Sequence, residues 1–263
     1  WYFYKQLWSE DKMNRNYNQD LYQEEDAKAY IEDYWTKRSD GFADLRKNEL
    51  HSDKYQRWES EILSQLPKED NLKILDIGCG AGFFSIILEK HGHQVTGIDL
   101  TESMIQDAKI LAAEECVNPS FLTMDAENLD FGDESFDVVI SRNLTWTLPH
   151  PRDAYREWLR VLKKGGILLN YDAEYAKDQK TSKLTGRHAH DDISKDLMNQ
   201  CNEIYHMLDI SEKHRPEWDH LILMQMDVNE CEVNPNVGEK IYKEQDIFYI
   251  PVPMFRIRAV KDS

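Results

Sequence analysis

The chain has 263 residues, of which 41% are hydrophobic and 31% are charged, so it is long enough to bury the core of one large domain. A formal net charge of −17 opposes binding to phosphate backbones and anionic membranes, and no apolar run reaches the roughly 18 residues that a membrane span needs. The four cysteines form no CxxC pair, and the opening residues lack the basic and aliphatic regions of a secretory signal; we therefore expect a cytoplasmic protein with no nucleic-acid or membrane partner and no metal centre.

The first 66 residues are acidic and aromatic and contain no strand-like run. Within them, Tyr55, Trp58, Ile62 and Leu66 recur every three to four residues, which is the spacing of one face of a helix. We predict a helical N-terminal cap over residues 1–66, closed by Pro67.

From residue 71 short apolar runs alternate with helical segments. The predicted strands are NLKILDIG, QVTGID, SFLTMD, FDVVIS and GILLNY, and the helices between them are AGFFSIILEKHG, TESMIQDAKILAAEE and AYREWLRVL. Such alternation is typical of a parallel sheet with right-handed crossovers, and continuous apolar runs indicate strands that are covered on both faces. We assign residues 67–173 to a ligand-binding core.

After Tyr171 the alternation stops. Residues 174–216 are polar and rich in His, Asp and Lys, with one helical stretch, and we predict that they are inserted after the fifth strand. Residues 217–263 then add a helix over EWDHLILMQM, a short strand at CEV and a final strand at MFRIRAV. The whole pattern predicts a single α/β domain with a sheet of about seven strands.

The most specific motif is Leu75-Asp76-Ile77-Gly78-Cys79-Gly80-Ala81-Gly82, which follows a strand and opens a helix. Glycines there allow a tight turn and a close approach of the backbone to a ligand, and the helix N-terminus offers free N–H groups. The spacing is G-x-G-x-G, and Phe83 stands where the dinucleotide fingerprint G-x-G-x-x-G has its third glycine. A P-loop would need a Gly-Lys-Ser/Thr sequence, which the motif lacks.

Acids follow the next two strands. Asp99 ends the second strand, where an acid accepts hydrogen bonds from ribose hydroxyls in nucleotide-binding βαβ units. Asp125 and Ala126 end the third strand, in a position suited to an adenine edge. Because the carboxyl ends of parallel strands meet at one edge of a sheet, we expect Gly78, Asp99 and Asp125 to surround one ligand.

These motifs, together with FDVVISRNLTWTLPHP and LKKGGILL, stand in the order of the successive motifs of class I S-adenosylmethionine-dependent methyltransferases. The chain resembles this family, in particular the small-molecule enzymes of the methyltransferase type 11 group, over roughly residues 71–171 and more weakly over 217–260. The resemblance implies a Rossmann-like, mostly parallel sheet of seven strands whose last strand is antiparallel. It also implies S-adenosylmethionine as cofactor and S-adenosylhomocysteine as product.

The resemblance further implies roles for the residues that match its motifs. Those expected to bind the cofactor lie around the methionine part and the sulfonium (Asp76, Gly78, Cys79, Gly80 and Gly82), at the ribose and adenine (Asp99, Leu100, Asp125 and Ala126), and after the fourth strand (Arg142).

The acceptor-side candidates come from the N-terminal cap and from the segment after the fourth strand. Tyr34 and Trp35 resemble lid residues that close over the cofactor, with Tyr34 as a candidate catalytic group and helix packing as the alternative. Asn143 is a second catalytic candidate. Trp146 is a candidate substrate contact whose ring suits a cationic acceptor, the alternative being a plain pocket wall.

The segment that leaves the fifth strand supplies more candidates. Tyr171 and Tyr175 are expected to contact the substrate, and Asp172 or Glu174 is a candidate base unless the loop is simply solvated. Residues 174–216 lie where relatives place a substrate-covering lid, and there His188 is a candidate base and His190 a candidate substrate contact. The cluster around these histidines has metal-type donors, but no further Cys or His stands close by, so we predict no metal.

The predicted function is methyl transfer to a small-molecule acceptor by in-line displacement, performed by a monomer or homodimer. A protein or peptide methyltransferase is the first alternative and would need an open groove. A non-catalytic S-adenosylmethionine binder that acts as a sensor or partner subunit is the second. A nicotinamide oxidoreductase is disfavoured by the glycine spacing.

Overall fold

The computed structural model describes residues 17–175, 193–249 and 252–263. Two helices precede the sheet, α2 (Tyr17–Leu50) and α3 (Asp53–Leu63). The Ser52 side chain caps α3 by accepting a hydrogen bond from the Lys54 backbone N–H at 3.2 Å. The expected apolar face of α3 buries Trp58 and Ile62, so the described part of the N-terminal segment is helical, as predicted.

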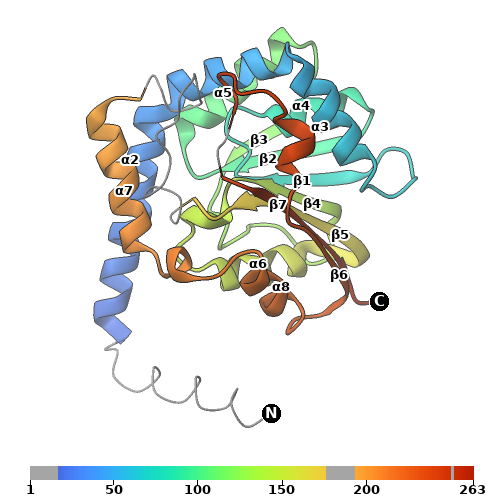
Figure 1. Ribbon diagram of the computed structural model, residues 1–263. Helices are drawn as coiled ribbons and strands as arrows, with labels where there is room; N and C mark the ends of the chain where they lie inside the picture. The colour runs from blue at the N-terminus through green and yellow to red at the C-terminus, as the bar shows by residue number, and fades with distance from the viewer. Residues whose placement is uncertain (1–16, 176–192, 250–251) are drawn as a thin grey trace.

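The core is a seven-stranded sheet in the order β3-β2-β1-β4-β5-β7-β6 (Figure 1). Its strands are β1 (Lys73–Ile77), β2 (Gln94–Asp99), β3 (Ser120–Thr123), β4 (Phe136–Arg142), β5 (Leu162–Ala173), β6 (Val228–Asn234) and β7 (Met254–Lys261). Pairs within β3-β2-β1-β4-β5 are parallel, whereas β7 runs antiparallel to both β5 and β6. The predicted Rossmann-like fold class, with an antiparallel last strand, is confirmed.

Helices cover both faces of this sheet (Figure 1). On one face lie α3, α4 (Phe83–Lys90) and α5 (Glu102–Glu114), and on the other lie α6 (Pro151–Val161) and α8 (Glu217–Leu223). Val138 and Ile140 of β4 pack into the first core, with Trp58 and Phe84, whereas Val139 packs into the second. Neighbouring residues of one strand therefore serve opposite cores, which explains the uninterrupted apolar runs.

Several strand and helix ends differ from the sequence prediction, as three examples show. β5 begins directly after α6, because Leu162 already pairs with Phe136 of β4 before the GILLNY run. β3 stops at Thr123, which leaves Asp125 in a loop. α8 stops at Leu223 because the chain then turns into β6.

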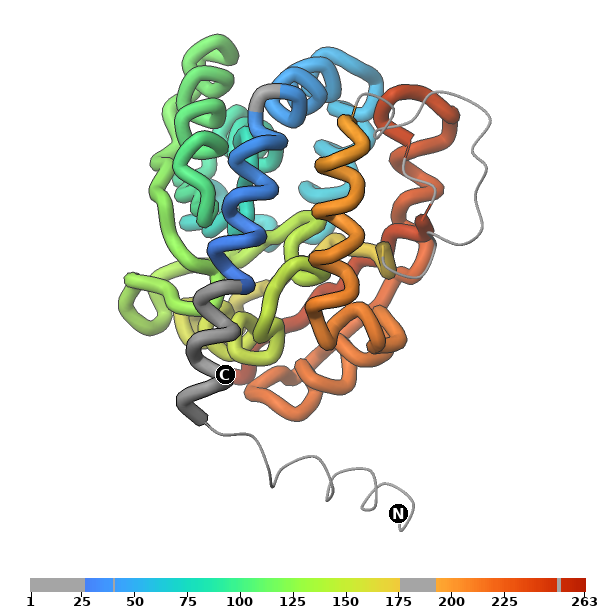
Figure 2. Tube along the Cα trace, turned by 90° about the vertical axis from the view of Figure 1, so that its left-hand side faces the viewer, coloured from blue at the N-terminus to red at the C-terminus, as the bar shows by residue number. Residues whose placement is uncertain are grey.

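The carboxyl edge of the parallel strands is covered by further helices. α7 (Lys195–Met207) lies beside α2 (Figure 2), and the short helices η1 (Thr145–Thr147) and η3 (Asp209–Glu212) lie near its end. Ile31, Trp146 and Ile204 form a third buried cluster among these elements. The last short helix, α9 (Gly238–Ile241), precedes β7. None of the helices in the described ranges combines the length and the apolar character needed to cross a bilayer.

The order of the strands locates the binding edge. β1 and β4 are neighbours, but the chain leaves β1 toward β2 on one side and leaves β4 toward β5 on the other. Ligands of open α/β sheets bind at such a topological switch point, outside the carboxyl ends of the strands. The glycine loop after β1 and the segment after β4 meet there.

Candidate active site

A cavity opens at this switch point. Its walls are the loop after β1, the ends of β2 and β3, the segment after β4, and side chains of α2 and α7. The predicted cofactor residues that line it are Asp76, Gly78, Cys79, Gly80, Asp99, Leu100, Asp125, Ala126 and Arg142. Gly82 lies outside the lining and is the N-cap of α4, packed close to Phe121.

The glycine loop has the backbone that its sequence predicted. Gly78 and Gly80 have φ values of 66° and 51°, which L side chains rarely adopt. A Cβ on Gly78 would lie 2.8 Å from the Leu144 methyl groups, and one on Gly80 would lie 3.0 Å from Phe42 Cε1. The loop is therefore packed between the segment after β4 and helix α2 and has no room for side chains.

Two acids stand beside the loop, Asp76, which is buried, and Asp99, which is half-buried. Asp76, at 2% exposure, accepts a hydrogen bond from Ser85 Oγ at 2.6 Å, and burial raises the pKa of its carboxyl to about 7. Asp99 accepts hydrogen bonds from the backbone N–H groups of Gly80 and Thr101, at 3.0 and 2.9 Å, and burial raises its pKa as well. Both carboxyls therefore offer acceptor oxygens at the cavity wall.

The third acid is paired with a residue that the sequence analysis missed. Lys28 of α2 reaches Asp125 Oδ2 at 2.7 Å and Glu127 Oε2 at 2.6 Å. The other Asp125 oxygen accepts the Glu127 backbone N–H at 2.8 Å. Lys28 lies 97 residues from Asp125 on a helix without a motif, so only the folded chain reveals that α2 closes over this edge.

Arg142 is held by an acid that the sequence analysis also missed. Its Nη2 lies 3.0 Å from Glu49 Oε1, and Arg46 Nη1 lies 2.5 Å from Glu49 Oε2. The guanidinium of Arg142 also stacks 4.6 Å from the centre of the Trp58 ring. Burial alone would lower the pKa of Arg142, but the charge of Glu49 raises it above its ordinary value. Arg142 therefore stays charged at the cavity wall.

Asn143 is the next residue and adopts φ 56°, a left-handed conformation that asparagine tolerates better than most residues. Its Oδ1 accepts a hydrogen bond from the Tyr175 hydroxyl at 2.7 Å, and its backbone oxygen accepts one from Trp146 Nε1 at 2.9 Å. Asn143 thus fixes two aromatic side chains that line the cavity.

Four aromatic side chains form a second wall of the cavity. Around Trp146, the ring centres of Tyr205, Tyr175 and Trp35 lie at 4.9, 5.3 and 6.3 Å. These four residues come from η1, α7, the end of β5 and α2, and all of them line the cavity. The predicted substrate contacts Trp35, Trp146 and Tyr175 are therefore brought together, and Tyr205 joins them.

Comparison with known proteins identifies the domain. Residues 75–170 match the family model described as a methyltransferase domain. Over 96 residues the chain is 36% identical to the ubiquinone biosynthesis O-methyltransferase of Coxiella burnetii, a match that covers 36% of this chain and 41% of that protein. Residues 75–170 are therefore similar to a methyltransferase domain. The chain spans less than half the length of this relative.

Solved structures share the fold of this methyltransferase domain. The YcgJ protein of Bacillus subtilis aligns with a TM-score of 0.53 at 20% identity, covering 78% of this chain and 98% of that one. Phosphoethanolamine N-methyltransferase 2 of Haemonchus contortus, solved with S-adenosylmethionine, aligns with a TM-score of 0.55 at 19% identity, covering 78% and 52%. At these identities the likeness extends to the fold alone.

Tyr34 packs against Trp35 of the aromatic wall, with the ring centres 5.1 Å apart. It is 3% exposed and contributes to the cavity, and its hydroxyl is hydrogen-bonded to the Cys201 thiol and to Arg38. Burial raises the pKa of Tyr34 above its ordinary value. Its hydroxyl therefore stays protonated near neutral pH and acts as a hydrogen-bond group there, not as a ready base.

Two predicted site residues lie away from the cavity. Asp172 has no exposed surface, and its Oδ2 lies 3.1 Å from Arg215 Nη1 and accepts the Trp146 backbone N–H at 3.0 Å. A carboxylate bound in this way is a positioning group beneath Trp146, which corrects its prediction as a candidate base. Tyr171 is also fully buried, with its ring against Trp58 and Phe84 in the first core, so it cannot contact a substrate. The end of β5 turns these side chains inward because the strand is covered on both faces.

The remaining candidates are in or near the inserted segment. Glu174 accepts a hydrogen bond from the Arg215 backbone N–H at 2.7 Å and so ties the insertion to the end of β5. His188 and His190 lie outside the described residues. Within the described ranges, no group of three or more His, Cys, Asp or Glu side chains is placed to hold a metal ion.

Proposed function

We propose that this chain is an S-adenosylmethionine-dependent methyltransferase that acts on a small molecule by in-line displacement. The observation that carries the proposal is that one cavity joins two kinds of wall. The glycine loop, Asp99 and Asp125 form the first, and the aromatic side chains around Trp146 form the second. A donor and an acceptor can thus meet in one cavity.

The residues of the first wall fit the donor. Gly78 and Gly80 carry no side chain, and a Cβ at either position would collide with its neighbours. A ligand can therefore approach the bare backbone of this loop closely. Asp99 provides a carboxylate for ribose hydroxyls, and Asp125 provides one for an amine on the adenine edge. Asp76 supplies the negative charge that a cationic ligand needs.

When bound, the donor supplies a methyl group that is already activated by its sulfonium. The protein's part is to hold the acceptor in line at about 3–3.5 Å and to exclude water. Trp35, Trp146 and Tyr175 provide the surface against which an acceptor packs. Asn143 fixes Tyr175 and Trp146 by hydrogen bonds and so holds that surface in one arrangement.

The two helices beside the cavity favour a small acceptor over a peptide. Helices α2 and α7 lie side by side across the edge of the sheet (Figure 2), and both contribute side chains to the cavity. Some of the chain's relatives carry names of small-molecule enzymes, such as the ubiquinone biosynthesis O-methyltransferase of Coxiella burnetii. Residues 174–216, of which α7 is a described part, act in this proposal as the lid that selects the acceptor.

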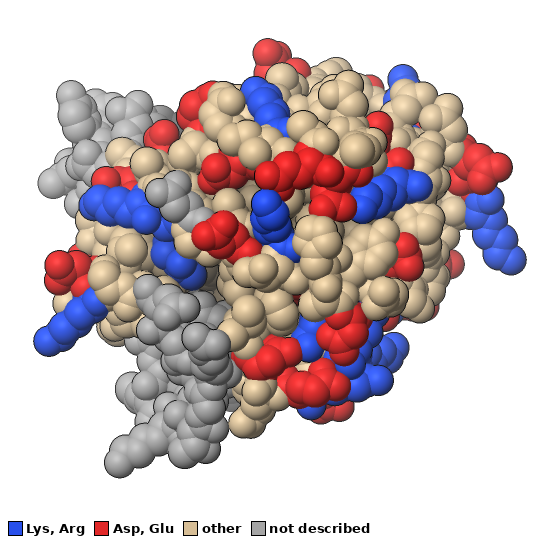
Figure 3. Space-filling view, turned by 90° about the horizontal axis from the view of Figure 1, so that it is seen from above, with Lys and Arg blue, Asp and Glu red and all other residues tan. Residues whose placement is uncertain are grey.

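In this proposal the protein works as a monomer or homodimer and has no nucleic-acid or membrane partner. The net charge of −17 supports the second part, because it opposes binding to phosphate backbones and anionic membranes. On the face seen in Figure 3, acidic and basic side chains are intermingled, which gives that face no broad field of one sign.

The test is release of S-adenosylhomocysteine from S-adenosylmethionine in the presence of fractionated cell extract. Turnover with a low-mass fraction is the expected result, and Asp99→Ala should lower it at least about tenfold at subsaturating S-adenosylmethionine. Turnover with the macromolecular fraction alone would replace the small-molecule proposal with a protein substrate. Tight donor binding without turnover in any fraction would instead support a sensor or partner subunit.

A further inference from the structure

A short irregular segment near the C-terminus is attached to helix α3. We call residues 242–249, which follow α9, the strap. Tyr242 and Phe248 of the strap are buried and pack into the first core, whereas Glu244 between them is exposed. Two aromatic side chains therefore anchor the strap to the body of the domain, although it forms neither a helix nor a strand.

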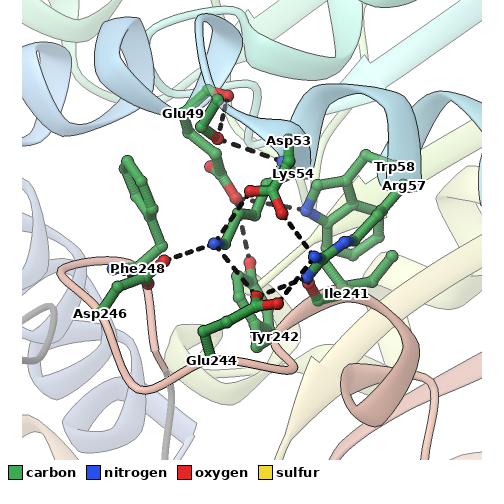
Figure 4. Close-up of polar contacts among 11 residues, drawn as sticks. Glu49, Asp53, Lys54, Arg57, Trp58, Ile241, Tyr242, Glu244, Asp246 and Phe248 are labelled. Carbon is green, nitrogen blue, oxygen red and sulfur yellow. Dashed lines mark hydrogen bonds and ion pairs between the residues drawn. The ribbon is translucent and has the colours of Figure 1, made fainter.

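Two basic side chains of α3 hold the strap, as Figure 4 shows. Arg57 donates to the two carboxylate oxygens of Glu244, at 2.7 and 2.9 Å, and to the Ile241 backbone oxygen at 2.8 Å. Such a bidentate contact fixes orientation as well as distance. Lys54, whose side chain is only 4% exposed, pairs with Asp246. Because the two bases stand three residues apart on one helix, they fix both halves of the strap relative to α3.

The strap brings the Tyr242 hydroxyl into the buried polar cluster around Glu49. This hydroxyl accepts a hydrogen bond from Arg142 Nη2 and donates one to Glu49 Oε1 at 3.2 Å. Burial raises the pKa of Tyr242 to about 12, so the hydroxyl keeps the proton that it donates. Among the described residues, Glu49 and Tyr242 are the hydrogen-bond partners of the Arg142 guanidinium.

Arg142 connects this cluster to the cavity. It ends β4, lines the cavity, and is followed by Asn143, which fixes two side chains of the aromatic wall. Arg46 also pairs with Glu49, so that one carboxylate serves two guanidinium groups. Tyr242 is the hydrogen-bond partner that Arg142 does not share with Arg46 among the described residues. The position of Arg142 at the cavity wall therefore depends on a residue of the strap.

We propose that Tyr242 is a positioning residue, which the strap holds against Arg142 so that the cavity wall keeps its shape for the donor. The inference rests on the proposed function, because donor binding is what reports the position of Arg142. A hydrogen bond from a guanidinium is charge-assisted and stronger than one between neutral groups. Without the hydroxyl, a buried N–H of Arg142 loses its acceptor and the side chain moves to find another. The strap thus links ion pairs on the surface of α3 to the wall of the binding site.

The first test removes only the hydroxyl. Tyr242→Phe keeps the ring in the core, and S-adenosylhomocysteine should bind to this variant at least about fivefold more weakly by calorimetry. Tyr249→Phe is the matched control, because Tyr249 lies in the same strap, loses the same group and does not line the cavity. Its affinity should equal that of wild type. If Tyr242→Phe lowers only the thermal stability and leaves the affinity unchanged, Tyr242 is structural and the inference is overturned.

A double-mutant cycle shows whether Tyr242 acts through Arg142. In Arg142→Met, Glu49 keeps Arg46 as its cation, so this variant should fold and bind S-adenosylhomocysteine more weakly than wild type. Adding Tyr242→Phe to Arg142→Met should change the affinity by less than about twofold. A further loss as large as that of Tyr242→Phe alone would contradict the inference, because Tyr242 would then act by another route.

The role of the strap is tested from its surface side. Arg57→Met removes the bonds to Glu244 and to the Ile241 oxygen but leaves Tyr242 in place, so S-adenosylhomocysteine should bind about twofold more weakly. Arg156→Met, which loses an exposed pair on α6, is the control and should bind like wild type. Equal affinities in these two variants would show that the strap does not set the position of Tyr242. A wild-type protein that binds no S-adenosylhomocysteine at all would instead contradict the proposed function.

Discussion

The two walls of the cavity are built in different ways. The donor wall comes from the ends of consecutive strands, between Asp76 and Ala126. The acceptor wall is made of side chains from α2, η1, the end of β5 and α7, which are far apart in the sequence. The first is therefore specified by local motifs and the second only by tertiary packing, so the acceptor wall can change while the donor wall stays the same.

The two walls also depend on different interactions. On the donor wall, Asp99 and Asp125 are held by backbone N–H groups of neighbouring residues. On the acceptor wall, Trp146 rests on a buried network in which Arg215 bridges Asp172 and Asp219. The network joins η1 and the segment before α8 to the end of β5, so its loss should disturb the acceptor wall first.

The largest expected effect comes from breaking this network. Arg215→Met leaves Asp172 and Asp219, both fully buried, without their cation, and removal of one partner from a buried ion pair costs about 3–5 kcal/mol. We expect a loss of that size in the free energy of unfolding, measured by urea denaturation. Arg156→Met is the control, since the Arg156–Asp153 pair is exposed and should contribute less than about 1 kcal/mol. Equal losses in the two variants would show that the network is not a support of the wall.

The second effect is confined to the donor wall. Asp99→Ala removes the acceptor for Gly80 N–H and for the ribose hydroxyls, so S-adenosylhomocysteine should bind at least about tenfold more weakly. The control is Asp133→Ala, whose side chain is 76% exposed and remote from the cavity lining. Calorimetry measures both. Unchanged affinity in Asp99→Ala would mean that the ligand does not lie along the end of β2.

The third effect is confined to the acceptor wall. Trp146→Leu removes the ring that contacts Trp35, Tyr175 and Tyr205, and such aromatic pairs contribute about 0.5–1.5 kcal/mol each beyond burial. We expect the acceptor KM to rise about tenfold in steady-state assays, with donor affinity unchanged. In Trp218→Leu, which loses packing in the same region but leaves the cavity lining intact, the KM should stay close to that of wild type. A drop in donor affinity in Trp146→Leu would show that the walls are coupled.

The sequence predicted the donor wall well and the acceptor wall poorly, for a physical reason. Gly78, Asp99 and Asp125 follow consecutive strands, so period and turn chemistry place them at one edge without any long-range information. Lys28 and Glu49 reach their partners from helix α2. The residue pattern of that segment predicts a helix but not the partners of its side chains. Their contacts depend on how α2 packs across the sheet edge, which no local pattern states.

Asp172 shows a different error, in which a residue at a strand end was predicted to face the ligand but is buried. Its position at the end of β5 suggested a base at the ligand edge, but the strand buries both of its faces and the side chain points to Arg215. A period-two pattern would have shown which residues face the cavity, whereas a continuous apolar strand carries no such pattern. The aromatic wall was partly predicted because Trp146 and Tyr175 flank strand ends, while Tyr205 required the placement of α7.

The smallest effect is a pH dependence of the donor wall. The pKa of Asp76 is raised to about 7, so below that pH its carboxyl is largely neutral in the ligand-free protein. A cationic donor binds the ionised form, so binding at low pH must first remove a proton, and affinity should increase as pH rises. Between pH 6.0 and 7.5 the ionised fraction grows about eightfold, which sets the upper limit of the change. Calorimetry with S-adenosylmethionine should show this rise in wild type and a weaker, flat profile in Asp76→Asn. A wild-type affinity that is flat or falls over this range would mean that Asp76 does not face the cation of the donor.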